Sequence, residues 1–170
     1  AIITGNRDPN VRSMEVSGSH THENKRLGIS SLLPEAVELI SGPGCPVCVT
    51  PVSYIDEALY LAEKCHATIC TFGDLVRVPG TAGTLAEARS RGARVQVVFT
   101  PLDAVTYAAE HPEEETVFLS VGFETTTPAA CLALRHAEAQ RAANFSLLTA
   151  NKTMPAAYTA MASHTDAYLY

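Results

Sequence analysis

Short apolar runs rich in β-branched residues alternate along the chain with stretches whose apolar residues recur at helical spacing. This alternation is typical of α/β folds built on a parallel sheet. The apolar runs predict strands at 11–16, 37–41, 67–72, 94–99, 116–121 and 145–150. The amphipathic stretches predict helices at 53–65, 84–92, 101–111 and 127–143. We therefore expect parallel-sheet, Rossmann-like α/β domains.

Proline, glycine and charged residues divide this pattern. Pro101 suits the first turn of a helix, and Gly92 suits the position just past the end of one. The polar segment HPEEET, residues 111–116, is the clearest break. We place a domain boundary there, with a first α/β domain over 1–112 and a second, incomplete α/β portion over 113–170 that could pack with the first as one unit.

Four unusual segments follow predicted strands. They are SGSHTH (17–22), GPGCPVC (42–48), GDLVRVPG (73–80) and GFETTTP (122–128). Open parallel sheets bind their ligands at the carboxyl ends of the strands. We therefore expect the functional residues to lie in these four segments.

Composition removes several classes of partner. Twelve basic and eighteen acidic side chains give a formal net charge of −6, and no cluster of Lys and Arg alternates with aromatic residues. Nucleic acid is therefore not an expected partner. No apolar run approaches the roughly 20 residues that cross a bilayer, and the segment AIITGNRDPN lacks the pattern of a secretory signal. We expect a cytoplasmic protein with no membrane span.

The CxxC pair Cys45 and Cys48 admits three interpretations. A closed metal site would need two more donors, and no second CxxC or HxxxH follows at suitable spacing. A redox pair is better supported, because a helix N-terminus near the first thiol would lower its pKa and make it the attacking thiolate. The third interpretation is a Gly/Pro loop with two half-buried thiols. We expect the remaining cysteines, Cys65, Cys70 and Cys131, to belong to the core.

Two further segments carry candidate residues. His20 and His22 are expected in a Gly/Ser turn after the first strand, where an imidazole can bind a metal or accept a proton. Glu124 stands where an α/β sheet presents ligand-binding groups. One of the threonines at 125–127 is expected to be the N-cap of the following helix.

Taken together, eight segments resemble the motifs of the HypD family of hydrogenase maturation proteins. They are MEVSGSHTH, LLPE, SGPGCPVCVTP, IDEA, TFGDLVRVPG, FTPLDAV, GFETTTPA and NFSLL. The resemblance implies two related α/β domains flanking a cleft, followed by a region that holds an iron–sulfur cluster. It also implies a scaffold on which the Fe(CN)2CO centre of nickel–iron hydrogenases is assembled. The implied partners are a HypC-type chaperone and the HypE and HypF proteins.

The resemblance assigns roles by position. Cys45 and Cys48 match the redox-active CxxC, His20 matches the histidine near the iron site, and Glu124 matches the glutamate of the GFETT block. The family motif reads MEVCGGHTH, so Ser17 stands where the iron-binding cysteine belongs. A neutral hydroxyl binds iron poorly, because it holds its proton far more tightly than a thiol. We expect iron to be bound only transiently, if at all, at this position.

The chain ends at Tyr170, short of the family's length, so we expect no iron–sulfur cluster and only part of the second domain. A divergent, shortened relative is our interpretation. A half-family chain would expose sheet edges, which predicts a homodimer.

The leading hypothesis is a metallocentre assembly scaffold whose CxxC cycles between dithiol and disulfide. One alternative is a binding module with no iron or redox role. The other is a free-standing thiol–disulfide oxidoreductase.

Overall fold

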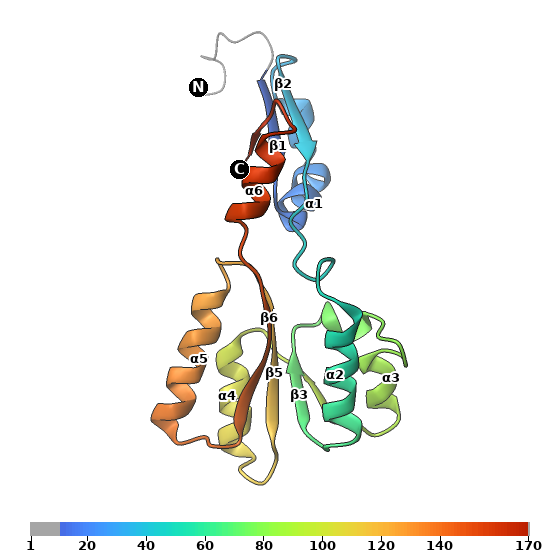
Figure 1. Cartoon of the computed structure of the whole chain (residues 1–170), viewed down its shortest axis with the longest axis vertical. Coiled ribbons are helices and arrows are strands. Elements are labelled where there is room, and N and C mark those ends of the chain that lie inside the picture. Colours follow the sequence, from blue (N-terminus) through green and yellow to red (C-terminus); the bar gives the residue numbers. More distant parts are fainter. Residues whose placement is uncertain (1–10, 170) are drawn as a thin grey trace. The chain divides into compact units, whose positions relative to one another are not determined.

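The computed structural model describes residues 11–169 and divides the chain into two compact units (Figure 1). The terminal unit combines Ala1–Cys45 with Met154–Tyr170, and the central unit is the continuous segment Pro46–Thr153. Each unit has its own parallel sheet. The parallel-sheet α/β architecture predicted from the alternating pattern is confirmed.

The terminal unit has a three-stranded parallel sheet in the order β2-β1-β7. Its strands are β1 (Val11–Glu15), β2 (Val37–Ser41) and β7 (Tyr168–Leu169). Its helices are α1 (Gly18–Arg26), the short 3-10 helix η2 (Ile29–Leu32) and α6 (Pro155–Ala162). The sheet therefore joins the beginning of the described chain to its end, since Ser13 of β1 pairs with Tyr168 of β7.

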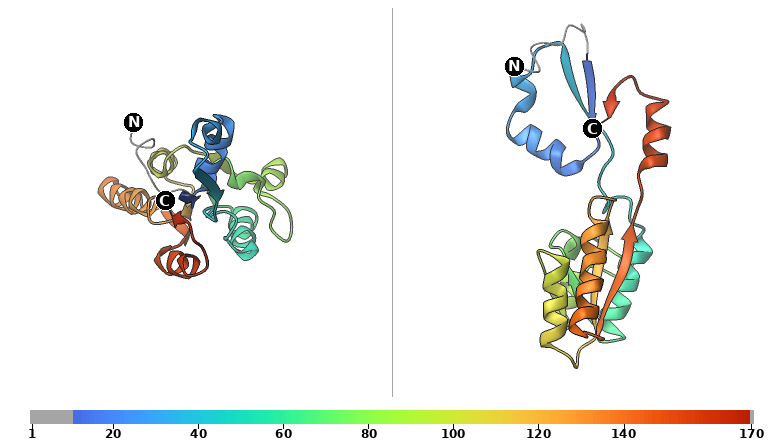
Figure 2. Two further views of the ribbon diagram at one scale, coloured as in Figure 1. Left: turned by 90° about the horizontal axis from the view of Figure 1, so that it is seen from above. Right: turned by 90° about the vertical axis from the view of Figure 1, so that its left-hand side faces the viewer.

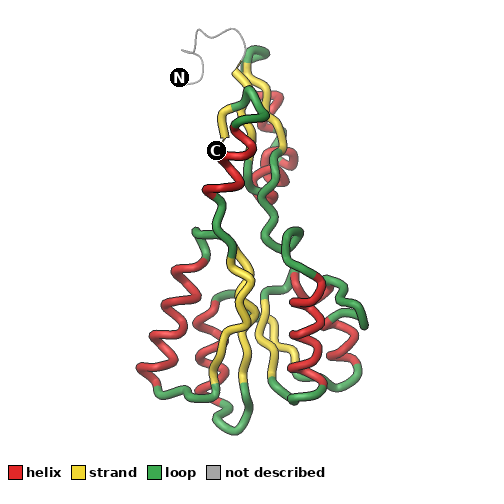
Figure 3. The backbone as a smooth tube through the Cα atoms, in the orientation of Figure 1, coloured by secondary structure: helices red, strands yellow, loops and turns green. Residues whose placement is uncertain are grey.

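The central unit has a four-stranded parallel sheet in the order β4-β3-β5-β6. Its strands are β3 (Thr68–Thr71), β4 (Val95–Val97), β5 (Thr116–Gly122) and β6 (Phe145–Asn151). Its helices are α2 (Val52–Glu63), η3 (Leu75–Arg77), α3 (Leu85–Ser90), α4 (Pro101–Glu110) and α5 (Thr127–Gln140). Figures 1 and 3 show the strands as a layer between α4 and α5 on one side and α2 and α3 on the other.

Two apolar clusters fill the faces of the central sheet. Ile55 and Leu59 of α2 pack with Leu119 of β5 on one face. Phe118 packs with Val105 of α4 and other apolar residues on the opposite face. Every residue of β5 is buried, as expected of a strand covered by helices on both sides (Figure 2). Replacing a fully buried phenylalanine such as Phe118 with alanine costs about 3–5 kcal/mol.

The predicted strands and the four predicted helices are all present, with ends shifted by a few residues at most. Pro101 begins α4, and Gly92 follows α3 with φ +102°. The sequence pattern did not predict α1 or α6. Among the residues of α1 and α6 whose burial the structure describes, none is buried, so no buried face could have revealed a helical period.

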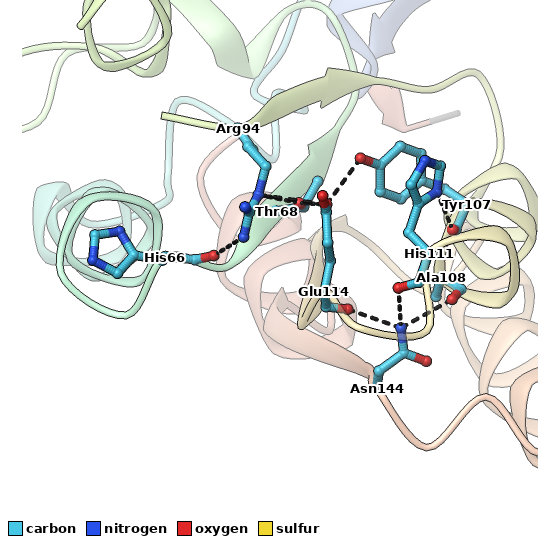
Figure 4. A network of polar contacts seen from close by, with 8 residues as sticks. All are labelled: His66, Thr68, Arg94, Tyr107, Ala108, His111, Glu114 and Asn144. Carbon is cyan, nitrogen blue, oxygen red and sulfur yellow. Dashed lines mark hydrogen bonds and ion pairs between the residues drawn. The ribbon is translucent and has the colours of Figure 1, made fainter. Parts of the chain in front are cut away.

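The polar segment 111–116 lies within the central unit and does not separate the two units. The Asn144 side chain holds it in place by donating to the carbonyl oxygens of Ala108, His111 and Glu114 at 2.9, 3.0 and 2.8 Å (Figure 4). The backbone nitrogen of Thr68 also donates to the carbonyl of Glu115 at 2.7 Å. The division of the chain thus differs from the expected boundary, because this segment is a tightly bonded connection within one sheet.

The Glu114 carboxylate adds a second set of bonds at this edge. It accepts hydrogen bonds from Thr68 Oγ1 at 2.6 Å and Tyr107 Oη at 3.1 Å, and Arg94 Nε lies 3.4 Å away. The bond from Thr68 and the other polar contacts lower the pKa of Glu114, although partial burial opposes them. The charged carboxylate therefore ties α4 to β3 and β4.

We predict that Glu114→Gln destabilises the protein at pH 7 by about 1 kcal/mol, because the amide accepts fewer charge-assisted bonds. A carboxyl group with a lowered folded-state pKa stabilises the fold above its ordinary pKa and loses that contribution as pH falls through the lowered value. The difference between wild type and variant should therefore shrink in acid. Urea unfolding at pH 7 and near pH 3 measures it, with Glu113→Gln as the control. A difference independent of pH would contradict the prediction.

Candidate functional site

In the terminal unit, the segment after β2 runs alongside the segment after β1. The two strands are parallel neighbours whose pairing ends at Glu15 and Ser41. Beyond that point the Gly42 nitrogen donates to the Glu15 carbonyl at 2.7 Å, and the Gly18 nitrogen donates to the Gly44 carbonyl at 3.4 Å. The SGSHTH and GPGC segments are therefore brought together at the carboxyl end of this sheet, as the sequence predicted.

Gly44 makes this approach possible. A Cβ atom at this position would overlap the carbonyl group of Val16 and lie 2.6 Å from the backbone nitrogen of Ser17. Both obstacles are backbone atoms, so a side-chain rotation cannot relieve the overlap. A glycine is therefore required for the CxxC segment to lie against the first loop.

The consequence is that Cys45 lies at the start of α1. A Cβ atom on Gly18, the first residue of α1, would be 3.8 Å from the Cβ atom of Cys45. Ser17 is the N-cap residue, with φ −144° and ψ 121°, and its carbonyl accepts from the Thr21 nitrogen at 3.0 Å. The N-terminus of a helix carries partial positive charge, which stabilises a nearby thiolate. The sequence predicted that the CxxC lies where a strand leads into the following helix, whereas the helix whose N-terminus lies beside Cys45 is α1, which precedes the motif.

The two histidines lie on α1, so the expectation that they occupy a Gly/Ser turn is wrong. Ser17 has the extended backbone of an N-cap residue, and α1 begins at the next residue, Gly18. Lys25 and Arg26 lie in the last turn of α1, where positive charge is favourable to the helix dipole. His20 is exposed and lines a hollow of about 310 Å³ with Ile29, Leu33 and Leu39 among others. His22 is also exposed but does not line that hollow. His20 is thus the histidine that lies in the first turn, closer to Ser17.

Both cysteines of the CxxC motif are disulfide-bonded in the structure. Cys45 is half-buried and Cys48 is exposed. The arrangement is the oxidised state of a CxxC pair, which a thiol or another reductant can reach from the side of Cys48.

The other three cysteines carry free thiols. Cys70 is buried in β3, and burial raises the pKa of its thiol to about 12, so it is a poor nucleophile at neutral pH. Cys65 and Cys131 are exposed, so their predicted place in the core is wrong. Cys65 lies beyond the end of α2, and Cys131 lies on a face of α5 that is open to solvent. The apolar residues beside them misled the prediction.

The GFETT segment lies in the central unit, where β5 leads into α5. Gly122 is necessary here because a Cβ atom would overlap Oγ1 of Thr126 and lie 2.9 Å from its Cβ. The hydroxyls of Thr126 and Thr127 both donate to the Phe123 carbonyl at 3.0 Å. Thr126 is the N-cap residue of α5, as expected of this threonine run, but its hydroxyl closes the turn instead of capping the helix. Glu124 is exposed in this turn at the carboxyl end of β5.

An apolar hollow of about 410 Å³ adjoins this turn and was missed by the sequence analysis. It lies between the start of α4 and the start of α5, over Phe118 and Ser120 of β5. Phe99 on its rim is 90% exposed. A phenylalanine directly precedes Thr100, the N-cap residue of α4, but an apolar residue is common at this position, so the sequence contained little sign of the hollow.

In residues 11–169, no group of three or more His, Cys, Asp or Glu side chains is placed to hold a metal ion. No helix of this same stretch is long and apolar enough to cross a membrane.

Comparison with known proteins gives the family of the chain. The family model for HypD, described as "Hydrogenase formation hypA family", matches residues 2–169. "Hydrogenase maturation factor HypD" of Cupriavidus necator is 48% identical over 147 residues, which are 86% of this chain and 39% of that protein.

Two further relatives carry the same name. HypD of Escherichia coli is 47% identical over 135 residues, 79% of this chain and 36% of that protein. HypD of Azotobacter vinelandii is 41% identical over 170 residues, 98% of this chain and 45% of that protein. The chain thus spans less than half the length of these relatives. Because the family model covers nearly all of it and its relatives match at high identity, the chain belongs to the HypD family.

Proposed function

We propose that this chain acts in the assembly of the Fe(CN)2CO centre of nickel–iron hydrogenases, with Cys45 and Cys48 as its redox pair. The observation that carries the proposal is the position of Cys45 against Ser17 and Gly18 at the start of α1. The names of the relatives, hydrogenase maturation factors, support the biological setting. A HypC-type chaperone and HypE and HypF proteins are the proposed partners.

The redox step follows from ordinary thiol chemistry. When the dithiol form of Cys45 and Cys48 becomes a disulfide, one S–S bond forms and two electrons and two protons leave. The electrons pass to the iron centre or to a partner's disulfide, and the reverse reaction needs an external thiol reductant. The N-terminus of α1 favours the thiolate of Cys45, so we assign Cys45 as the attacking sulfur and Cys48 as its resolving partner.

The iron centre is the substrate of this assembly reaction, and the candidate iron ligands in the terminal unit differ in their affinity for iron. The imidazole of His20 and the thiolate of reduced Cys45 are suitable ligands for low-spin iron. Ser17 is not, because its hydroxyl keeps its proton at neutral pH. We therefore propose that this chain holds iron weakly at position 17. Glu124 lies in the central unit, and we propose it as a proton carrier only because it matches the glutamate of the family's GFETT block.

The thiol assignment predicts a difference in alkylation rate. The folded protein is first reduced and alkylated, and it is denatured only afterwards for digestion. Under these conditions Cys45 should react with iodoacetamide at pH 7 about tenfold faster than exposed Cys65, because the helix N-terminus favours its thiolate. Mass spectrometry of peptides measures both rates, and Cys131 is a second internal control. Equal rates at Cys45, Cys65 and Cys131 would overturn the redox proposal and favour a binding module with no redox role.

Restoring the family's cysteine should strengthen iron binding. We expect anaerobically purified Ser17→Cys, produced with a HypC-type chaperone, to retain iron and to show cyanide and carbonyl bands in the infrared, with little signal in the natural sequence. A thiolate at the N-cap of α1 is both a better ligand and better stabilised than a hydroxyl. Ser53→Cys is the matched control on α2. The absence of iron and bands in Ser17→Cys would contradict the proposed assembly role.

The approach of the two loops should depend on Gly44. We predict that Gly44→Ala destabilises the terminal unit by about 1–3 kcal/mol, because the added methyl group overlaps backbone atoms. The alkylation rate of Cys45 should also fall toward that of Cys65. Gly73→Ala is the control, since a Cβ there meets only Val97 at an ordinary 3.6 Å. Amide exchange in α1 together with the alkylation rates tests the prediction, and unchanged values in Gly44→Ala would refute it.

A further inference from the structure

A polar hollow of about 330 Å³ lies in the central unit where α2 and α3 end and β4 begins. Alanine and glycine residues form much of its lining, which leaves space between the longer side chains around them. Those longer side chains are Glu63, Lys64, His66, Arg91 and Arg94. The hollow lies at the amino end of the central sheet, away from the carboxyl end where GFETT is found.

The charge of this hollow is opposite to that of the chain. Three cationic side chains and the Glu63 carboxylate line it, and the Glu114 carboxylate lies 3.4 Å from Arg94, which leaves an excess of one positive charge when His66 is neutral. The chain as a whole has a formal net charge of −6. A local excess of positive charge in an acidic protein attracts anions to this position.

Three groups hold the Arg94 guanidinium in place. Its Nε donates to Thr68 Oγ1 at 3.0 Å, its Nη2 donates to the His66 carbonyl, and the Glu114 carboxylate is 3.4 Å away (Figure 4). His66 presents that carbonyl from a left-handed backbone conformation, φ 56°, which is uncommon for a residue other than glycine. No residue in 11–169 accepts a hydrogen bond from Nη1 of Arg94. The guanidinium is thus oriented in advance, with one nitrogen available for a ligand.

Arg91 is arranged in the same way. Its Nε and Nη2 both donate to Glu63 Oε1, at 3.1 and 2.7 Å. Nη1 of Arg91 and the ammonium group of Lys64 have no acceptor among the described side chains and backbone groups. Two anchored guanidinium groups and one ammonium group therefore border the same space.

Helix polarity explains part of this arrangement but not all of it. Lys64 and Arg91 are the C-cap residues of α2 and α3, where positive charge is favourable without any ligand. Arg94 directly precedes β4 and is not at a helix end. The anchoring of its guanidinium by Thr68, His66 and Glu114 has no equivalent explanation in the helix dipole.

We propose that this hollow binds a small, doubly charged oxyanion of the phosphate type. Nη1 of Arg94 and Nη1 of Arg91 donate to its oxygens, and Lys64 balances its charge. Guanidinium groups suit tetrahedral oxyanions because they present several N–H donors in one plane. The proposal is independent of the redox and iron chemistry proposed above, since it involves different residues, all of them in the central unit.

Inorganic phosphate is the probe. In ¹H–¹⁵N spectra of the full 170-residue chain at pH 7.5, with ionic strength held constant by NaCl, phosphate should shift the amides of 62–66 and 90–94. The shifts should saturate with a Kd between about 0.1 and 10 mM. Phenyl phosphate distinguishes the source, because binding of both compounds indicates a phosphate monoester and binding of phosphate alone indicates the free ion.

Variants test the named side chains. Arg91→Gln and Lys64→Gln should each weaken phosphate binding about tenfold, because each removes a charge-assisted contact. Arg135→Gln on α5 makes the same change in net charge elsewhere in the unit and should leave the Kd unchanged. The proposal is overturned by shifts that do not saturate, by acetate binding as tightly as phosphate, or by equal weakening in Arg135→Gln.

Discussion

The candidate site depends on the close approach of two backbone segments at the carboxyl end of the terminal sheet. Gly44 lies where any side chain would overlap the carbonyl of Val16, and the bond from Gly42 to Glu15 extends the strand pairing past the last residues of β1 and β2. This contact sets Cys45 beside the first residues of α1. The electrostatic effect of the helix and the chemistry of the CxxC pair both follow from it, because helix-end charge falls off within about one turn.

The central unit meets the same kind of constraint in a different way. Gly122 allows the chain to turn sharply after the fully buried strand β5, and two threonine hydroxyls close the turn on the Phe123 carbonyl. At the opposite edge, Asn144 and Glu114 fix the connection between α4 and β5. The polar segments 111–116 and 122–128, which interrupt the hydrophobic pattern, are therefore fixed by specific hydrogen bonds.

The strands and the four amphipathic helices could be predicted because their periodicity reflects burial on a sheet. α1 could not, since a helix exposed on most of its surface has no apolar stripe, and its start is set by the conformation of Ser17 and the neighbouring loop. The division of the chain was missed for a related reason: the segment 111–116 is polar because it bonds with Asn144 and Thr68, which lie far away in the sequence. The family motifs proposed the residues of the candidate site, but they did not predict that Gly44 brings Cys45 to α1.

The pairing of β1 with β7 has a consequence for how the protein is made. The central unit is one continuous segment, so all of its contacts are available once residue 153 has left the ribosome. The terminal sheet instead pairs Ser13 with Tyr168 and needs both ends of the chain. During synthesis the central unit can therefore fold first and shorten the distance between those ends, which lowers the entropic cost of closing so long a loop. The terminal unit, which carries Ser17, His20 and Cys45, is complete only after β7 at residues 168–169 has been synthesised.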